Sequence, residues 1–114
     1  MTTLRERRCE PCTGDTPRLD QAAIDGLLPE VPDWEVRGGR LRRLFVFRDF
    51  VHAMRFVDAM AVLAEAEQHH PDFAVHYREV EVSIWTHAVD GLSDNDFILA
   101  AKIDGLLEHG TDGR

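Results

Sequence analysis

Three histidines at the ends of two predicted elements are the side chains in this sequence best suited to proton transfer. His69 and His70 end a predicted helix, because Pro71 biases the residue before it away from helical backbone angles. His87 ends a predicted strand. An imidazole titrates near neutral pH, so a group of histidines predicts either a proton-transfer site or a metal site. Since the two groups end two different elements, they can converge on one pocket.

Two carboxylates have a spacing that could support these histidines. Glu65 lies four residues before His69, so both side chains share one helix face, where the carboxylate can orient the imidazole. A solvent-exposed ion pair at the helix end explains the same spacing equally well. Asp96 completes a Ser93-x-x-Asp96 capping box, which predicts a helix start. The same carboxylate is also predicted to lie near His87, since the box adjoins the turn after that residue.

The elements that must position these residues are three helices and four strands. Asp20, Asp49 and Ser93 are suited to helix N-caps, and Gly38-Gly39 predicts a tight turn between two strands. The predicted elements are a helix over 20–28, strands over 34–37 and 41–47, a helix over 50–68, strands over 73–77 and 80–87, and a final helix opened by Ser93. This order, α-β-β-α-β-β-α, predicts an α+β fold: a four-stranded antiparallel sheet with three helices packed on one face.

The last predicted strand separates core-facing from outward-facing side chains. The predicted core-facing set is Val80, Val82, Ile84 and Thr86. Trp85 and His87 therefore point off the core side, where the indole can form the wall of a ligand pocket.

The long helix over 50–68 is apolar on more than one face. One stripe consists of Phe50, Met54, Val57, Ala61 and Ala64, and the other of Ala53, Phe56, Met60 and Leu63. A helix with so wide an apolar surface either lies deep in the core or presents one stripe to another subunit. We therefore expect an oligomer.

Length and composition favour a single soluble domain. The chain has 114 residues, of which 44% are hydrophobic and 30% are charged. Its net charge of -8 argues against a nucleic-acid partner, which needs clustered Lys and Arg. No apolar run approaches the ~20 residues of a membrane span, and the charged first residues lack the pattern of a secretory signal. We therefore expect a cytoplasmic protein with no membrane partner.

Residues 1–17 are predicted to form an N-terminal arm, residues 18–108 the folded domain, and residues 109–114 a tail. The arm contains Cys9-Glu10-Pro11-Cys12. Such a C-x-x-C pair can be structural, can supply half of a zinc site, or can be a redox pair. Zinc takes four ligands, so a zinc site would need a histidine pair or a second subunit. No strand–helix pattern precedes the pair, which weakens the redox interpretation.

The combination of these motifs resembles that of the pterin-4a-carbinolamine dehydratases. The resemblance covers about residues 18–105, and its most specific part is His-His-Pro followed at fixed spacing by Thr-His. The C-x-x-C arm resembles one in a bacterial subset of that family. The motifs are Glu65-x-x-x-His69-His70-Pro71, Tyr77-x-x-Val80-x-Val82-x-Ile84-x-Thr86-His87 and Gly91-Leu92-Ser93-x-x-Asp96-x-x-Leu99-Ala100, preceded by Trp34, Gly39 and Phe45-x-Phe47-x-Asp49-Phe50.

The resemblance implies dehydration of 4a-hydroxytetrahydropterin to quinonoid dihydropterin, which recycles the cofactor of aromatic amino acid hydroxylases. It implies no metal and no organic cofactor, and a homotetramer or homodimer. The catalytic residues that it implies are His69, His70 and His87, with Gln68, Trp85, Thr86 and Ala88 as substrate-binding neighbours and Glu65 and Asp96 in support. Gln68, Trp85 and Ala88 depart from the usual residues of that family, which leaves the preferred pterin side chain open.

Two other functions are compatible with these residues. One is a non-catalytic pterin-binding or regulatory module that acts through the face of the long helix. The other is a metal-dependent hydrolase that uses the histidines as ligands. Intact His69, His70 and His87 favour the dehydratase, and the scarcity of acidic residues beside His70 and His87 weakens the hydrolase interpretation.

Overall fold

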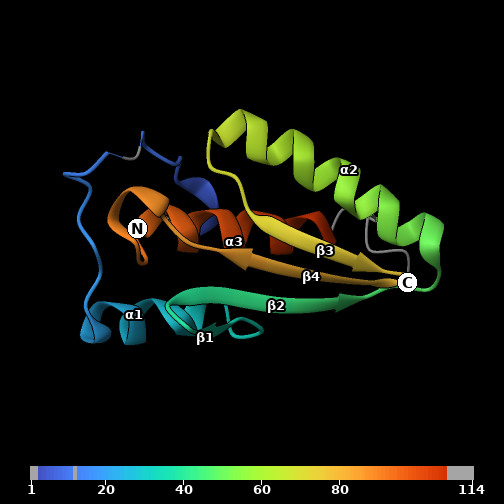
Figure 1. Ribbon diagram of the computed structural model, residues 1–114, viewed down its shortest axis with the longest axis horizontal. Coiled ribbons are helices and arrows are strands. Elements are labelled where there is room, and N and C mark those ends of the chain that lie inside the picture. Colours follow the sequence, from blue (N-terminus) through green and yellow to red (C-terminus); the bar gives the residue numbers. More distant parts are fainter. Residues whose placement is uncertain (1–2, 12, 108–114) are drawn as a thin grey trace.

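The antiparallel sheet that the sequence predicts is present in the computed structural model, which describes residues 3–11 and 13–107 (Figure 1). Neighbouring strands run antiparallel in the order β1-β2-β4-β3. The strands are β1 (Glu35–Arg37), β2 (Arg40–Val46), β3 (Asp72–His76) and β4 (Glu79–Ile84). Gly38 and Gly39 both have positive φ, which glycine adopts without steric cost in the tight turn between β1 and β2. The predicted α+β fold is therefore confirmed.

Three α-helices accompany the sheet, and each begins where its capping residue predicts. Asp20 and Asp49 each accept a hydrogen bond from a backbone N–H in the first turn of their helix, and Ser93 forms a capping box with Asp96. The α-helices are α1 (Gln21–Leu27), α2 (Phe50–Glu67) and α3 (Asp94–Leu106), and the short 3-10 helices are η1 (Leu4–Glu6), η2 (Leu28–Glu30) and η3 (His87–Val89).

Strands β3 and β4 end earlier than the alternation predicts. Strand β4 stops at Ile84, because Thr86 forms only an isolated bridge and His87 begins η3. Strand β3 stops at His76, and Tyr77, with a φ of 57°, turns the chain into β4. His87 therefore lies in a tight turn after the sheet rather than in the pleated strand, which corrects the predicted boundary.

The core lies between the sheet and helices α2 and α3, which cover one sheet face (Figure 1). The aromatic centre of this core is Phe56 of α2, whose ring centroid lies 4.6 Å from that of Phe45 and 5.0 Å from that of Phe47. Ile24 of α1 joins the same cluster. The sheet residues buried with them are Leu41, Val80, Val82 and Ile84. This packing holds the ends of β2 and β4 rigidly against the helices.

Helix α2 buries most of the second predicted stripe and only part of the first, in which Phe50 and Ala61 are exposed. Val57, which belongs to the first predicted stripe, is only 8% exposed and lies in the core. The large apolar side chains that remain exposed on α2 are Phe50, Val51 and Val62. The face available to another subunit therefore runs along these residues and excludes Val57.

The described part of the N-terminal arm packs along α3. Leu4 is buried in the core, and the Arg5 Nε donates a hydrogen bond to the Ala101 carbonyl at 3.3 Å. Arg7 forms an ion pair with Asp94 at 3.2 Å. Residues 3–11 thus contact the folded domain directly, and the arm is not separated from it by a linker.

Part of the predicted organisation lies outside the described residues, namely Cys12 and the tail at 109–114. Among the described residues, none of the helices combines the length and the hydropathy that a membrane span requires.

Candidate active site

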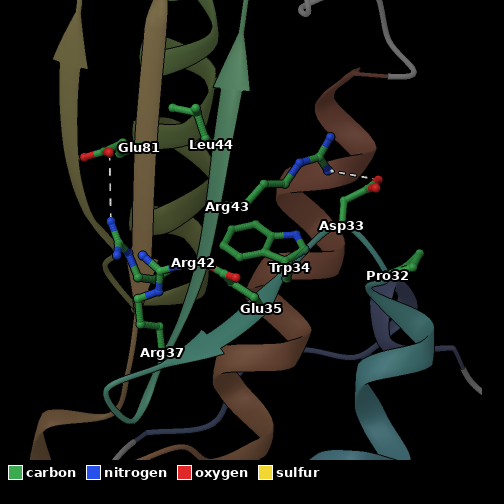
Figure 2. A pocket seen from close by; sticks show the side chains of 9 residues that line it. All are labelled: Pro32, Asp33, Trp34, Glu35, Arg37, Arg42, Arg43, Leu44 and Glu81. Carbon is green, nitrogen blue, oxygen red and sulfur yellow. Dashed lines mark ion pairs between the residues drawn. The ribbon is translucent and has the colours of Figure 1, made fainter.

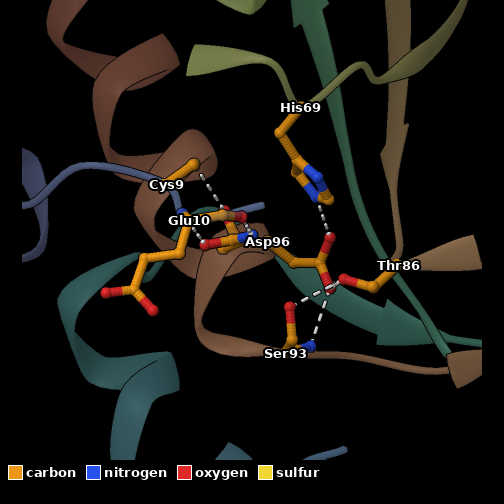
Figure 3. Close-up of polar contacts among 7 residues, drawn as sticks. Cys9, Glu10, His69, Thr86, Ser93 and Asp96 are labelled. Carbon is orange, nitrogen blue, oxygen red and sulfur yellow. Dashed lines mark hydrogen bonds and ion pairs between the residues drawn. The ribbon is translucent and has the colours of Figure 1, made fainter. Parts of the chain in front are cut away.

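A buried pair of His69 and Asp96 lies at the centre of the predicted histidine site (Figure 3). Helix α2 ends at Gln68, whose left-handed backbone turns the following residue inward. The Nε2 atom of His69 then lies 2.6 Å from Asp96 Oδ1. His69 is 7% exposed and Asp96 is fully buried. A carboxylate only accepts hydrogen bonds, so Asp96 orients the imidazole by accepting its N–H.

The second oxygen of Asp96 holds the end of β4. The hydroxyl of Thr86 donates to Asp96 Oδ2 at 2.8 Å, and the backbone N–H of Ser93 donates to the same atom at 2.8 Å. The Thr86 and Ser93 hydroxyl oxygens are 2.7 Å apart (Figure 3). One carboxylate therefore joins the end of α2, the segment after β4 and the start of α3. The sequence predicts Asp96 near His87, and its hydrogen bonds are with His69, Ser93 and Thr86, the residue before His87.

The predicted pair of Glu65 and His69 does not form. Glu65 instead pairs with His70, whose Nε2 lies 2.5 Å from the carboxylate, and both side chains are more than half exposed. Gln68 also turns back to this residue, since its Nε2 donates to the Glu65 carbonyl at 2.7 Å. The left-handed residue at the helix end is the reason, because it breaks the four-residue spacing on which the prediction relied.

His87 lies against Trp85, and these two residues flank Thr86 in the sequence. The two rings are stacked, with centroids 4.1 Å apart and planes inclined by 20°. The Arg40 guanidinium lies over the same indole, 3.7 Å from its centroid. Ala88 follows in η3 and is exposed. Arg40 had no signal in the sequence, because its contact depends on the register of β2 against β4.

The described arm reaches the same end of α3. The Cys9 backbone N–H donates to Glu67 Oε1 at 2.8 Å, and the Cys9 thiol lies 3.5 Å from the Asn95 carbonyl oxygen. The Asn95 side chain both accepts from the Glu10 N–H at 2.9 Å and donates to the Glu10 carbonyl at 2.6 Å (Figure 3). These contacts hold the arm against Asn95, the residue that precedes Asp96. No local pattern in the sequence predicts them.

A separate hollow of about 480 Å³ lies at the open end of β1 and β2 (Figure 2). Within its lining, Arg43 pairs with Asp33 at 3.7 Å. Two lining residues also bind Asp104: Arg43 forms an ion pair with it at 2.6 Å, and the Trp34 indole N–H donates to it. Burial raises the pKa of the Asp104 carboxyl above its ordinary value of 3.8, against the opposing effect of both hydrogen bonds. The lining residues are Pro32, Asp33, Trp34, Glu35, Arg37, Arg42, Arg43, Leu44 and Glu81. None of them is a predicted site residue.

The predicted site residues therefore fall into three groups. His69, Thr86 and Asp96 share one buried network, and Trp85 and His87 stack. At the exposed end of α2, Gln68 and His70 each contact Glu65. Within residues 3–11 and 13–107, no three His, Cys, Asp or Glu side chains are grouped so that they could hold a metal ion. The arrangement provides imidazoles that can give and take protons.

The fold and this site define a small α+β domain in which histidine-bearing segments meet at one end of an antiparallel sheet. Residues 17–106 match the family Pterin 4 alpha carbinolamine dehydratase. The match covers most of the chain, and the chain belongs to this family. The resemblance seen in the sequence motifs is thereby confirmed.

Individual relatives support the same assignment. The chain is 45% identical over 105 residues to a protein of Dechloromonas aromatica (strain RCB), covering 92% of this chain and 94% of that one. It is 44% identical over 109 residues to one of Rickettsia canadensis (strain McKiel), covering 94% and 100%. The names of both place them among the pterin-4-alpha-carbinolamine dehydratases.

A solved structure from Brucella melitensis has the same fold. It is described as a transcriptional coactivator/pterin dehydratase and superimposes with a TM-score of 0.75 at 30% identity. The alignment covers 79% of this chain and 98% of that one.

Proposed function

We propose that this protein dehydrates a 4a-hydroxytetrahydropterin to the quinonoid dihydropterin, using histidines as acid and base. The observation that carries the proposal is the double contact of Asp96. By binding His69 through one oxygen and Thr86 through the other, this carboxylate holds the end of α2 next to the segment that bears His87. Family membership supports the same reaction class.

The chemistry requires two proton movements. The hydroxyl at C4a leaves as water and must receive a proton, and the proton on N5 must go to an acceptor as the C4a–N5 double bond forms. In the proposal His87 donates to the leaving hydroxyl and His69 accepts from N5. Asp96 stabilises the imidazolium that His69 becomes. His70 binds and orients the pterin ring rather than transferring a proton.

The remaining site residues are proposed to surround the pterin. The neighbours are Gln68, Trp85, Thr86 and Ala88, with Glu65 holding His70. The reaction needs no metal ion and no organic cofactor, since both protons move between side chains and substrate. We place the protein in the cytoplasm as a homo-oligomer, a dimer or a tetramer, that regenerates tetrahydropterin for an aromatic amino acid hydroxylase.

The decisive experiment is a stopped-flow absorbance assay with synthetic 4a-hydroxytetrahydropterin, run with and without a chelator. We expect His69→Ala and His87→Ala each to lower kcat by roughly 10²–10⁴-fold, the usual cost of removing a positioned acid or base. His70→Ala should mainly raise KM. The control is His76→Ala, which removes an exposed histidine of β3 outside the proposed site.

Two results would overturn the proposal. Full kcat in His87→Ala between pH 6 and 8.5 would exclude this histidine as the proton donor. Loss of activity on chelation would show that a metal ion takes part.

A second candidate is a regulatory module that binds a partner through α2. The observation that favours it is that Phe50, Val51 and Val62 are large apolar side chains of one helix and are each at least half exposed. A protein that binds the pterin but gives no turnover, in wild type and variants alike, would favour this alternative over the dehydratase.

A further inference from the structure

We propose that Arg40 and Trp85 are positioning residues, which fix the plane of the His87 imidazole by stacking with it in one column. The proposal rests on the proposed function, because it assigns His87 as the proton donor. It adds Arg40 to the site and gives Trp85 a positioning role in place of the substrate-binding role that is proposed for it above.

The two contacts of the indole carry this inference. Trp85 stacks on His87 with centroids 4.1 Å apart, and the Arg40 guanidinium carbon lies 3.7 Å from the indole centroid. Two flat groups at van der Waals distance from one ring cannot both lie over the same face without overlapping. They therefore lie on opposite faces, and the indole is sandwiched between them. Neither of its faces is left for a pterin to stack upon.

The column joins strand β2 to the residue that follows strand β4. Leu41 of β2 pairs with Ile84, the last residue of β4, so Arg40 and Trp85 each lie one residue beyond this last pair. Cross-strand neighbours at such positions are close enough for long and aromatic side chains to interact. A guanidinium over an indole is the favourable orientation of a cation–π pair, because it faces the negative side of the ring. The rigid sheet therefore fixes the indole.

The backbone beneath His87 is held independently of the column. Thr86 exchanges backbone hydrogen bonds with Gly91 at 2.8 and 3.4 Å, and the Asp90 N–H donates to the His87 carbonyl at 3.2 Å. The Thr86 side chain is anchored on Asp96. With this turn fixed, the orientation of the imidazole depends on its two side-chain torsions alone. Stacking on Trp85 restricts both, which is the preorganisation that a proton donor requires.

The test combines a spectroscopic signature with kinetics, using Trp85→Ala, Trp85→Phe and Arg40→Ala. Arg42→Ala is the matched control, because it removes an arginine two residues along the same sheet face, which pairs with Glu81 at 3.9 Å. In the free protein, the ring protons of His87 should be shifted upfield by the indole ring current. That shift should be lost in Trp85→Ala, kept in part in Trp85→Phe, and unchanged in Arg42→Ala.

The kinetic readout separates positioning from substrate binding. We expect Trp85→Ala to lower kcat by up to roughly 100-fold with KM changed little, since misplacing a reacting group by about 1 Å costs that much. Trp85→Phe should restore most of kcat, and Arg40→Ala should lie between them. A rise in KM with unchanged kcat in Trp85→Ala would instead make the indole a substrate wall and overturn the proposal.

The spectroscopic result does not depend on turnover. If the wild-type protein dehydrates no pterin, the proposed function fails, while the His87 ring shift still reports whether the column exists. Unchanged His87 resonances in Trp85→Ala would refute the column even where catalysis is intact. Arg40→Ala guards against a folding defect, because Arg40 is exposed and its removal leaves the core intact.

Discussion

Replacing Asp96 with asparagine should destabilise this protein more than any other single change of a carboxylate to its amide among the described residues. The side chain keeps its size and shape, so the effect isolates charge and hydrogen bonding. Asp96 is fully buried and accepts three hydrogen bonds, from His69 at 2.6 Å and from Thr86 and the Ser93 backbone at 2.8 Å each.

The magnitude follows from these three bonds. An asparagine has one acceptor oxygen and one donor NH₂. It therefore cannot accept at once from His69, which donates to Oδ1, and from Thr86 and Ser93, which donate to Oδ2. One of the groups that now donate to Asp96 then faces a donor, at a cost of about 1–3 kcal/mol for a buried unsatisfied group. The remaining bonds lose their charge assistance, which adds about 1 kcal/mol. The free energy of unfolding should therefore fall by about 2–4 kcal/mol.

Urea denaturation followed by circular dichroism measures this change. With an m-value of about 2 kcal/mol per molar urea, the middle of the usual range, the midpoint should move down by roughly 1–2 M. The matched control is Asp94→Asn, two residues earlier in the same helix turn, whose side chain is 49% exposed and pairs with Arg7. A surface ion pair contributes about 0–1 kcal/mol, so this variant should unfold close to the wild type.

Equal urea midpoints for Asp96→Asn and Asp94→Asn would contradict the predicted loss of stability in Asp96→Asn. That result would mean that the network around Asp96 rearranges without cost. It would also remove the structural basis for a fixed orientation of His69.

Three further outcomes are expected. The hydrogen bond from the His52 backbone lowers the pKa of Asp49 below 3.8, so the stabilisation by this carboxylate is present above that value and is lost as pH falls through the lower folded pKa. Asp49→Ser keeps a cap without the charge, so its difference in urea midpoint from wild type should shrink as pH falls below 3.8. Cys9→Ser with Cys12→Ser should dehydrate pterin within a few-fold of wild type, because the 2.8 Å contact of Cys9 to Glu67 uses its backbone N–H, which serine keeps. Loss of most turnover with the fold intact would place the thiols in the site. Val62 is 72% exposed on α2, so Val62→Glu should sediment as a smaller species than the wild-type oligomer at micromolar concentration, and an unchanged assembly would exclude this helix face as the interface.

Local patterns in the sequence were sufficient to predict the helices and strands of this fold. The period of two in β2 and β4, the glycine pair before β2 and the caps at Asp20, Asp49 and Ser93 act over a few residues, so each could be recognised without knowledge of the tertiary structure. The same holds for the end of α2 before Pro71. The histidines could be identified as the chemical groups of interest because the capacity of an imidazole to give and take protons belongs to the residue type.

The partners of those histidines were decided by the tertiary structure. The sequence pattern paired His69 with Glu65, four residues away on one helix face, yet the chain pairs it with Asp96, 27 residues away. A single left-handed residue, Gln68, is the cause, because it rotates the chain out of the helical spacing and directs the imidazole into the core. Backbone conformation at one position is not encoded by side-chain periodicity, so this exchange of partners could not be predicted from spacing.

The stacked column of Arg40, Trp85 and His87 and the docking of the arm also depend on contacts between segments that are distant in the sequence. Arg40 meets Trp85 because β2 and β4 pair in one register, and a shift by one residue would place them on opposite faces of the sheet. Cys9 and Glu10 meet Glu67 and Asn95 across 58 and 85 residues of chain. The sequence by itself determined which helices and strands form and which side chains can transfer protons. Packing between distant segments decided which of those side chains are buried, paired and oriented, because contacts between distant segments exist only in the folded chain.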